Sequence, residues 1–127
     1  MKTLAVGIGC DRGCDPQAVK QTVAAALADA GLSADAVFAV ASIDLKFDEP
    51  AIAAAAAAWH VPSLFFTADV LEKETPRLRN PSELVFAHTG CHGVAEAAAL
   101  AAVGIDGMLL VPKIKGPGVT VAVARRA

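Results

Sequence analysis

The chain has 127 residues, a length that predicts one domain, 1–127, with a sizeable core. A formal net charge of −2, with five Phe and one Trp, argues against a nucleic-acid-binding protein. Although 55% of the residues are hydrophobic, no window offers the ~18 consecutive apolar residues of a membrane span. Three cysteines, an odd number, argue against a disulfide framework and predict a cytoplasmic location.

Apolar runs alternate with alanine-rich helical patterns along the chain. Continuously apolar runs predict strands that are covered on both faces. The expected strands are 3–8, 36–41, 61–66, 108–111 and 119–124. Helices are expected where apolar residues recur at helical spacing after capping signals such as Asp15-Pro16 and Asn80-Pro81. The expected helices cover 16–30, 51–60, 67–71, 80–87 and 94–102.

The connections between these elements predict the topology. Helical segments separate the first four strands, which favours parallel strands. Segment 112–118 is too short for a helical crossover, so the last two strands should form an antiparallel hairpin. Segment 73–79, the most polar stretch, is expected to be a mobile surface loop. The sequence therefore predicts an α/β three-layer sandwich, with a mostly parallel five-stranded sheet and an antiparallel C-terminal edge hairpin.

A glycine-rich turn joins the first strand to the first helix. Gly9 and Gly13 would let the backbone approach a ligand closely, and Cys10 and Arg12 lie in the same turn. Free N–H groups at the positive end of a helix suit an anion. The pattern is equally typical of a turn that is glycine-rich for tight turning alone.

The carboxyl ends of the predicted parallel strands indicate where a ligand would bind. In open α/β sheets, ligands bind beyond these ends. The segments that follow the strands bring together one acid and several cations, which are Asp44, Arg12, Lys46, Lys113 and Lys115. Such a set suits a ligand with several carboxylates or phosphates. The alternative is that these lysines are ordinary surface side chains.

Five motifs follow one another in order along nearly the whole chain. They are Gly7-Ile8-Gly9-Cys10 with Arg12-Gly13, Ser42-Ile43-Asp44-Leu45-Lys46 before Asp48-Glu49-Pro50, Gly93-Val94-Ala95-Glu96-Ala97-Ala98-Ala99-Leu100, Leu110-Val111-Pro112-Lys113, and Gly118-Val119-Thr120-Val121-Ala122. In this combination the chain resembles the CobE family of cobalamin biosynthesis, which is similar to the C-terminal domain of CbiG. Its size matches the free-standing CobE form.

The resemblance implies a protein of cobalamin (vitamin B12) biosynthesis that binds or handles a precorrin or corrin intermediate around ring contraction. Precorrins carry acetate and propionate carboxylates, which basic side chains and a helix N-terminus would bind. Resemblance to CbiG implies a hydrolase instead, which opens the lactone of cobalt-precorrin-5A and releases acetaldehyde. No cofactor is expected. The expected partners are the intermediate and other enzymes of the pathway, and the protein would be a monomer or a homodimer.

Two carboxylates are candidates for catalysis of such a hydrolysis. Asp44 lies in a segment at the predicted ligand site, and Glu96 lies in the first turn of a helix that follows a glycine-rich turn. Either would activate water or protonate a lactone oxygen if its pKa were suitably shifted. The structural alternatives are that Asp44 holds a turn and that Glu96 favours the helix N-terminus.

A metal-binding accessory protein is a further alternative. Cys10, Cys14, Cys91 and His92 together would form a Cys3His set for zinc or cobalt. The spacing of these residues is poor evidence for such a site, because Cys-x3-Cys differs from the usual Cys-x2-Cys pair. Cysteine is also common as a small buried residue beside tight turns. No metal ligand is therefore assigned.

Overall fold

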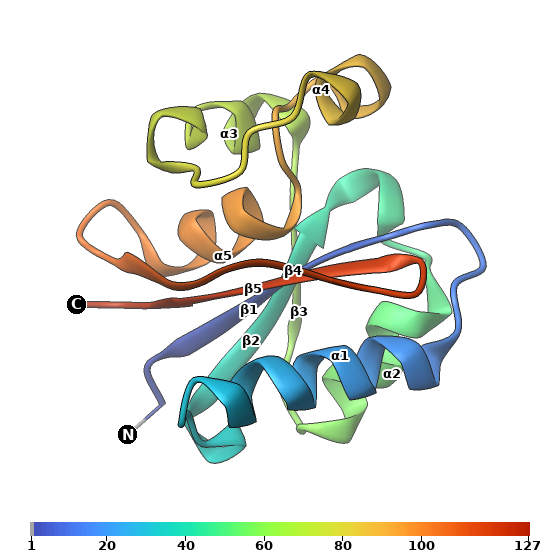
Figure 1. Ribbon diagram of the computed structural model, residues 1–127, viewed down its shortest axis with the longest axis vertical. Coiled ribbons are helices and arrows are strands. Elements are labelled where there is room, and N and C mark those ends of the chain that lie inside the picture. Colours follow the sequence, from blue (N-terminus) through green and yellow to red (C-terminus); the bar gives the residue numbers. More distant parts are fainter. Residues whose placement is uncertain (1) are drawn as a thin grey trace.

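The computed structural model describes residues 2–127, which form one five-stranded sheet in the order β3-β2-β1-β5-β4 (Figure 1). The strands are β1 (Leu4–Cys10), β2 (Val37–Ile43), β3 (Ser63–Phe66), β4 (Met108–Gly116) and β5 (Val119–Arg125). β2 pairs in parallel with β1 and β3, whereas β5 runs antiparallel to β1 and β4. The predicted α/β sheet with an antiparallel hairpin at its edge is confirmed.

β5 lies inside the sheet, between β1 and β4. Its residues pair along the whole of β1, from Arg125 opposite Leu4 to Val119 opposite Cys10. The pairing extends beyond the strands, because the N–H of Arg126 donates to the carbonyl of Thr3 at 2.9 Å. β4 consequently runs in the same direction as β1 and forms the outer edge of the sheet.

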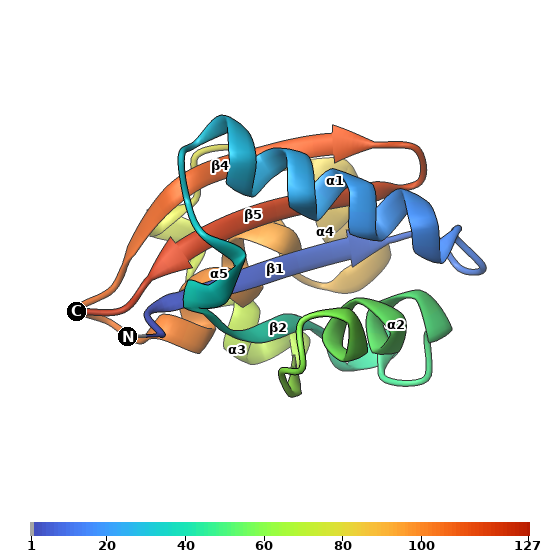
Figure 2. The same ribbon diagram turned by 90° about the horizontal axis from the view of Figure 1, so that it is seen from below.

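Helices cover both faces of the sheet. α1 (Pro16–Asp29) and α2 (Pro50–Ala58) pack on one face (Figure 2), and α5 (Ala95–Val103) packs on the other. α3 (Ala68–Glu72) and α4 (Glu83–Thr89) lie beyond α5, on the side away from the sheet (Figure 1). The three-layer arrangement therefore carries an additional outer layer. Within residues 2–127, no helix has the length and apolar character needed to cross a membrane.

α5 approaches the sheet most closely at Gly7. A Cβ atom at Gly7 would lie 1.8 Å from the carbonyl oxygen of Ala95 and 2.8 Å from the amide nitrogen of Ala99. Ala95 and Ala99 are themselves buried, at 2% and 0% exposure. Small residues on both elements thus place the first turn of α5 directly against β1.

Two capping signals have different outcomes. The Asp15 side chain accepts from the N–H of Gln17 at 2.9 Å, as the Asp-Pro pair predicts for the start of α1. For α4, the prediction of Asn80 as the N-cap is wrong. Ser82 caps α4 by accepting from the N–H of Val85 at 3.2 Å. The Asn80 side chain is directed instead to Glu96, to which it donates at 2.8 Å.

Segment 73–79 is not the free surface loop that its polarity predicts. It contains a 3-10 turn, Thr75–Arg77, and the guanidinium of Arg77 pairs with Glu74 at 2.7 Å. The same guanidinium donates to the carbonyl oxygens of Gly107 at 3.0 Å and Gly104 at 3.2 Å. Arg77 thus binds the segment to the C-terminal end of α5, where unpaired carbonyl groups attract a cation.

β4 is longer than predicted and is bulged. Its pairing with β5 shifts register between Leu109 and Val111 and again between Val111 and Ile114. Pro112 lies within the second shift, where an edge strand tolerates a residue without an N–H. The N–H of Lys113 donates to Glu96 at 2.8 Å. Lys113 and Lys115 are therefore strand residues, although the sequence placed them in a loop.

Candidate functional site

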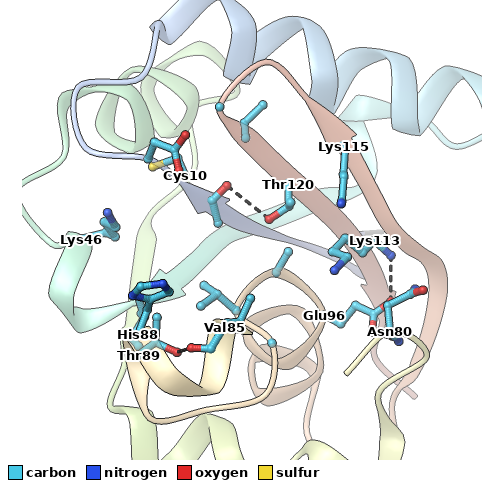
Figure 3. A pocket seen from close by; sticks show the side chains of 18 of the residues that line it. Cys10, Lys46, Asn80, Val85, His88, Thr89, Glu96, Lys113, Lys115 and Thr120 are labelled. Carbon is cyan, nitrogen blue, oxygen red and sulfur yellow. Dashed lines mark hydrogen bonds between the residues drawn. The ribbon is translucent and has the colours of Figure 1, made fainter. Parts of the chain in front are cut away.

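A cavity of about 550 Å³ opens at the carboxyl ends of β1 and β2 (Figure 3). This is the end of the sheet at which the sequence predicted a ligand site. Its walls are the N-terminal turn of α5, one side of α4, the segment after β2 and the β4–β5 hairpin. Such a volume is typical of small-molecule sites.

The structure brings six of the predicted site residues together around this cavity. They are Gly9, Cys10, Lys46, Glu96, Lys113 and Lys115. Figure 3 shows Lys46 near His88 on one side of the cavity, with Lys113 and Lys115 on the other. The cavity therefore has cationic side chains on opposite sides, with Thr120 between them (Figure 3).

Arg12 and Gly13 lie outside the lining. Arg12 pairs with Asp48 at 2.8 Å and with the buried Glu49 at 3.6 Å, and it also donates to the Leu45 carbonyl. The hydrogen bond from Arg12 lowers the pKa of Asp48 below its ordinary value. The N–H of Gly13 donates to Glu49 at 3.2 Å. The turn after β1 therefore binds two carboxylates of the chain itself, those of Asp48 and Glu49.

The helix N-terminus at the cavity belongs to α5. Ala95 and Glu96, its first residues, line the cavity together with Gly93 and Val94. In the chain as described, the N-cap Val94 makes no side-chain hydrogen bond to the helix. The first turn of α5 therefore presents backbone N–H groups and the positive end of a helix dipole beside the cavity. The sequence contained the signal, a Gly90–Gly93 turn before this helix.

Glu96 lines the cavity but is engaged by the protein. It is 2% exposed, and its oxygens accept from the N–H groups of Arg79, Asn80 and Lys113 at 2.8–2.9 Å, and from the Asn80 side chain. Burial raises the pKa of Glu96, but these hydrogen bonds outweigh it and hold the pKa below its ordinary value. This environment favours a structural carboxylate that is ionised at neutral pH over a proton donor.

Asp44 begins a 3-10 turn, Asp44–Lys46, directly after β2. Its carbonyl accepts from the N–H of Phe47 at 3.1 Å, and it lies outside the cavity lining. Its neighbours Leu45 and Lys46 do line the cavity. The geometry therefore agrees with the structural alternative, in which Asp44 holds the turn.

The structure does not bring the four residues of the Cys3His alternative together. Within residues 2–127, no group of three or more His, Cys, Asp or Glu side chains could hold a metal ion. Cys91 is buried in a cluster with Leu71 and Ala98, whereas Cys10 and Cys14 pack against the other core. Burial, with a hydrogen bond and charge repulsion from Cys14, raises the pKa of Cys10 to about 12. His92 is bound to carboxylates of α3 and α4.

Sequence reasoning missed the contribution of α4. This helix lines the cavity with Leu84, Val85, His88 and Thr89. His92 holds α4 in place, because its ring stacks on Phe86 at 4.3 Å and bonds to Glu72 at 2.9 Å. Strand ends alone do not predict this wall, since α4 is placed by contacts between separate elements.

Comparison with known proteins identifies the family. The family model described as Cobalamin synthesis G C-terminus matches residues 4–124. Protein CobE of a Sinorhizobium species is 48% identical over 121 residues, covering 95% of this chain and 79% of that protein. The cobalt-precorrin-5A hydrolase of Priestia megaterium is 33% identical over 123 residues, covering 97% of this chain and 32% of the hydrolase.

Solved structures agree with this assignment. The structure of CobE, a protein from the cobalamin (vitamin B12) biosynthetic pathway, matches with a TM-score of 0.92 and 37% identity, over 98% of this chain and 91% of that one. The cobalamin biosynthesis protein chiG of Agrobacterium tumefaciens str. C58 matches with a TM-score of 0.74 and 31% identity, over 98% of both chains. The chain therefore belongs to the family of the cobalamin synthesis G C-terminus, and it is a cobalamin biosynthesis protein of the CobE type.

Proposed function

We propose that the cavity binds the carboxylate-bearing edge of a precorrin or corrin intermediate. The observation that carries the proposal is the arrangement of Lys46, Lys113 and Lys115 around a cavity that also faces the first turn of α5, which has no side-chain cap. Lysine ammonium groups and helix N–H groups are both ligands for carboxylates. Acetate and propionate groups on different edges of one ring would reach cations on both sides.

The mouth of the cavity supports a ligand with an apolar face. Leu45 and Leu84 line the cavity and are 52% and 70% exposed. Apolar surface left exposed beside a polar site is typical of a ligand-binding surface. In this arrangement the macrocycle rests on the two leucines while its carboxylates reach the lysines.

Carriage of the intermediate is favoured over hydrolysis of its lactone. The hydrogen bonds to Glu96 occupy both of its oxygens, and Asp44 lies outside the lining. A general acid or base needs a free position within hydrogen-bond reach of the reacting group. Hydrolysis remains the second function to test, because one relative is named a cobalt-precorrin-5A hydrolase.

An anaerobic titration with a ring-contracted precorrin lactone tests the proposal. The visible spectrum of the ligand is the readout. Trp59 emission is less suitable, because Trp59 lies at the C-terminal end of α2, partly buried against the core on the other face of the sheet and outside the cavity lining. Stoichiometric binding with an unchanged chromophore over hours supports a carrier. Release of acetaldehyde would instead make the protein a hydrolase, and absence of binding would contradict the proposed site.

Variants of the cavity lysines test which charges bind the ligand. Lys46→Ala and Lys113→Ala should each weaken binding about tenfold, the effect of losing one charge-assisted hydrogen bond. Lys20→Ala removes the same charge from α1, on the opposite face of the sheet, and should leave the affinity unchanged. Equal effects of all three substitutions would indicate a nonspecific response to net charge and would contradict the assigned cavity.

A further inference from the structure

Arg12 connects two segments that are 33–36 residues apart in sequence. It lies in the turn between β1 and α1, and its guanidinium donates to the carboxylate of Asp48 at 2.8 Å and to the backbone carbonyl of Leu45. The next residue of the turn, Gly13, donates its N–H to Glu49 at 3.2 Å. The turn is thus bound to segment 44–49 at both ends of that segment.

Segment 44–49 has little apolar burial between its ends. Ile43 and Glu49 are 1% and 3% exposed, but Leu45 and Phe47 are 52% and 71% exposed. Its middle therefore depends on polar contacts. Within the segment these are the hydrogen bonds from Phe47 to Asp44 and from Glu49 to Lys46.

The contact between Arg12 and the carbonyl of Leu45 is important because it lies one residue away from the cavity lysine Lys46. Lys46 is the next residue and lines the cavity, whereas Arg12 lies outside the lining. Fixing the carbonyl of Leu45 restricts the backbone torsions that direct the Lys46 side chain. Arginine suits this contact because its planar fork binds a carboxylate and a carbonyl at the same time, which a lysine ammonium does with less geometric restriction.

We propose that Arg12 is a positioning residue, which holds the backbone at Leu45 so that Lys46 faces the bound ligand. This inference rests on the proposed function of the cavity. It assigns to Arg12 an indirect role in binding, in place of the direct contact with the ligand that the sequence predicted.

A double-mutant cycle distinguishes the indirect role from the direct one. With the precorrin lactone as ligand, Arg12→Ala should weaken binding about fivefold to tenfold in the otherwise unchanged protein. In the Lys46→Ala background the same substitution should change the affinity less than about twofold, because its effect acts through Lys46. In the Lys113→Ala background its effect should remain in full. Multiplicative effects of Arg12→Ala and Lys46→Ala would overturn the proposal.

Amide hydrogen exchange without ligand separates failure of this inference from failure of the proposed function. Arg12→Ala should speed exchange at Phe47 and Glu49 about tenfold or more, because segment 44–49 loses the contacts of the Arg12 guanidinium with Leu45 and Asp48 and keeps only that of Gly13 with Glu49. Arg126→Ala is the matched control, since Arg126 also donates to a backbone carbonyl, that of Lys2, away from the cavity. Unchanged exchange in Arg12→Ala overturns the positioning role, whether or not the lactone binds.

Discussion

Gly7 and Gly9 show that a glycine motif beside a cavity can serve the packing of a helix against a strand. A Cβ at Gly7 would overlap the backbone of α5, and a Cβ at Gly9 would lie 2.6 Å from the hydroxyl oxygen of Thr120. Gly7 thereby allows the first turn of α5 to reach the end of β1, where the cavity opens. The motif therefore shapes the cavity through the placement of a helix, as well as through its own turn.

Gly7→Ala should destabilise the fold by about 3 kcal/mol, because the added methyl group meets backbone atoms that cannot rotate away. Gly13→Ala, in the same motif, is the comparison. Gly13 has a φ of +73° with open space around it, so alanine there should cost only the ~1–2 kcal/mol of a left-handed backbone. Urea unfolding followed by circular dichroism measures both. Equal costs would contradict the close-packing explanation.

At the scale of elements, Glu96 joins α5 to two neighbours. Its carboxylate accepts from segment 79–80 and from the bulge of β4, so a single buried charge fixes one corner of the cavity. The register shift in β4 accounts for this contact. The shift frees the N–H of Lys113 from the pairing with β5, and this N–H donates to the Glu96 carboxylate. The same contact holds the backbone of Lys113 beside the cavity that both residues line.

Glu96→Gln should lower the free energy of unfolding by about 3 kcal/mol at pH 7, because an amide nitrogen replaces an oxygen that accepts from N–H groups. The folded pKa of Glu96 is lowered, so its stabilisation is complete above its ordinary pKa of 4.5 and is lost as the pH falls through the folded value. The difference in the free energy of unfolding between Glu96→Gln and the unsubstituted protein should therefore become smaller below about pH 4.5. A difference that stays constant from pH 7 to pH 3 would rule out the charge as the cause.

His92 connects α4 to α3, much as Glu96 connects α5 to its neighbours. The contribution of His92 to stability depends on pH in the opposite direction to that of Glu96. The hydrogen bond with Glu72 raises the pKa of His92, and Glu83 of α4 lies 3.3 Å from its other ring nitrogen. In the described chain, none of the residues of α4 is buried. The docking of α4 therefore depends strongly on His92, which binds carboxylates best when protonated.

His92→Gln should lower the melting temperature most at or below the ordinary histidine pKa of 6.5. Because the pKa of His92 is raised in the folded protein, the stabilisation from its contacts with carboxylates is complete below pH 6.5. This stabilisation is lost as the pH rises through the pKa of His92 in the folded protein. Melting curves at pH 6 and pH 9 should thus show a larger effect of the substitution at pH 6. His60→Gln, at a residue in the turn after α2, is the control. A larger effect of His92→Gln at pH 9 would contradict the ion-pair role.

At the scale of the whole molecule, the sequence predicts the sheet better than the outer layer. Apolar runs and short connections indicate all five strands. The rule that ligands bind beyond the carboxyl ends of parallel strands brings Lys46, Lys113 and Lys115 to one end of the sheet, where they line the same cavity. The extent of β4 was missed because Pro112 reads as a strand breaker unless the strand is known to be an edge. The position of α4 depends on His92 contacting Glu72, twenty residues away, and no local pattern carries that information.

The pairing of β1 with β5 also has a consequence for protein architecture. Leu4 lies opposite Arg125, and Thr3 bonds to Arg126, so the chain enters and leaves the sheet at neighbouring points (Figure 2). The cavity lies at the opposite end of β1, beside Gly9 and Cys10. A unit with adjacent entry and exit points can be inserted into another polypeptide, or circularly permuted, without rerouting its interior. That geometry suits a domain that matches 32% of a longer hydrolase and most of a shorter relative.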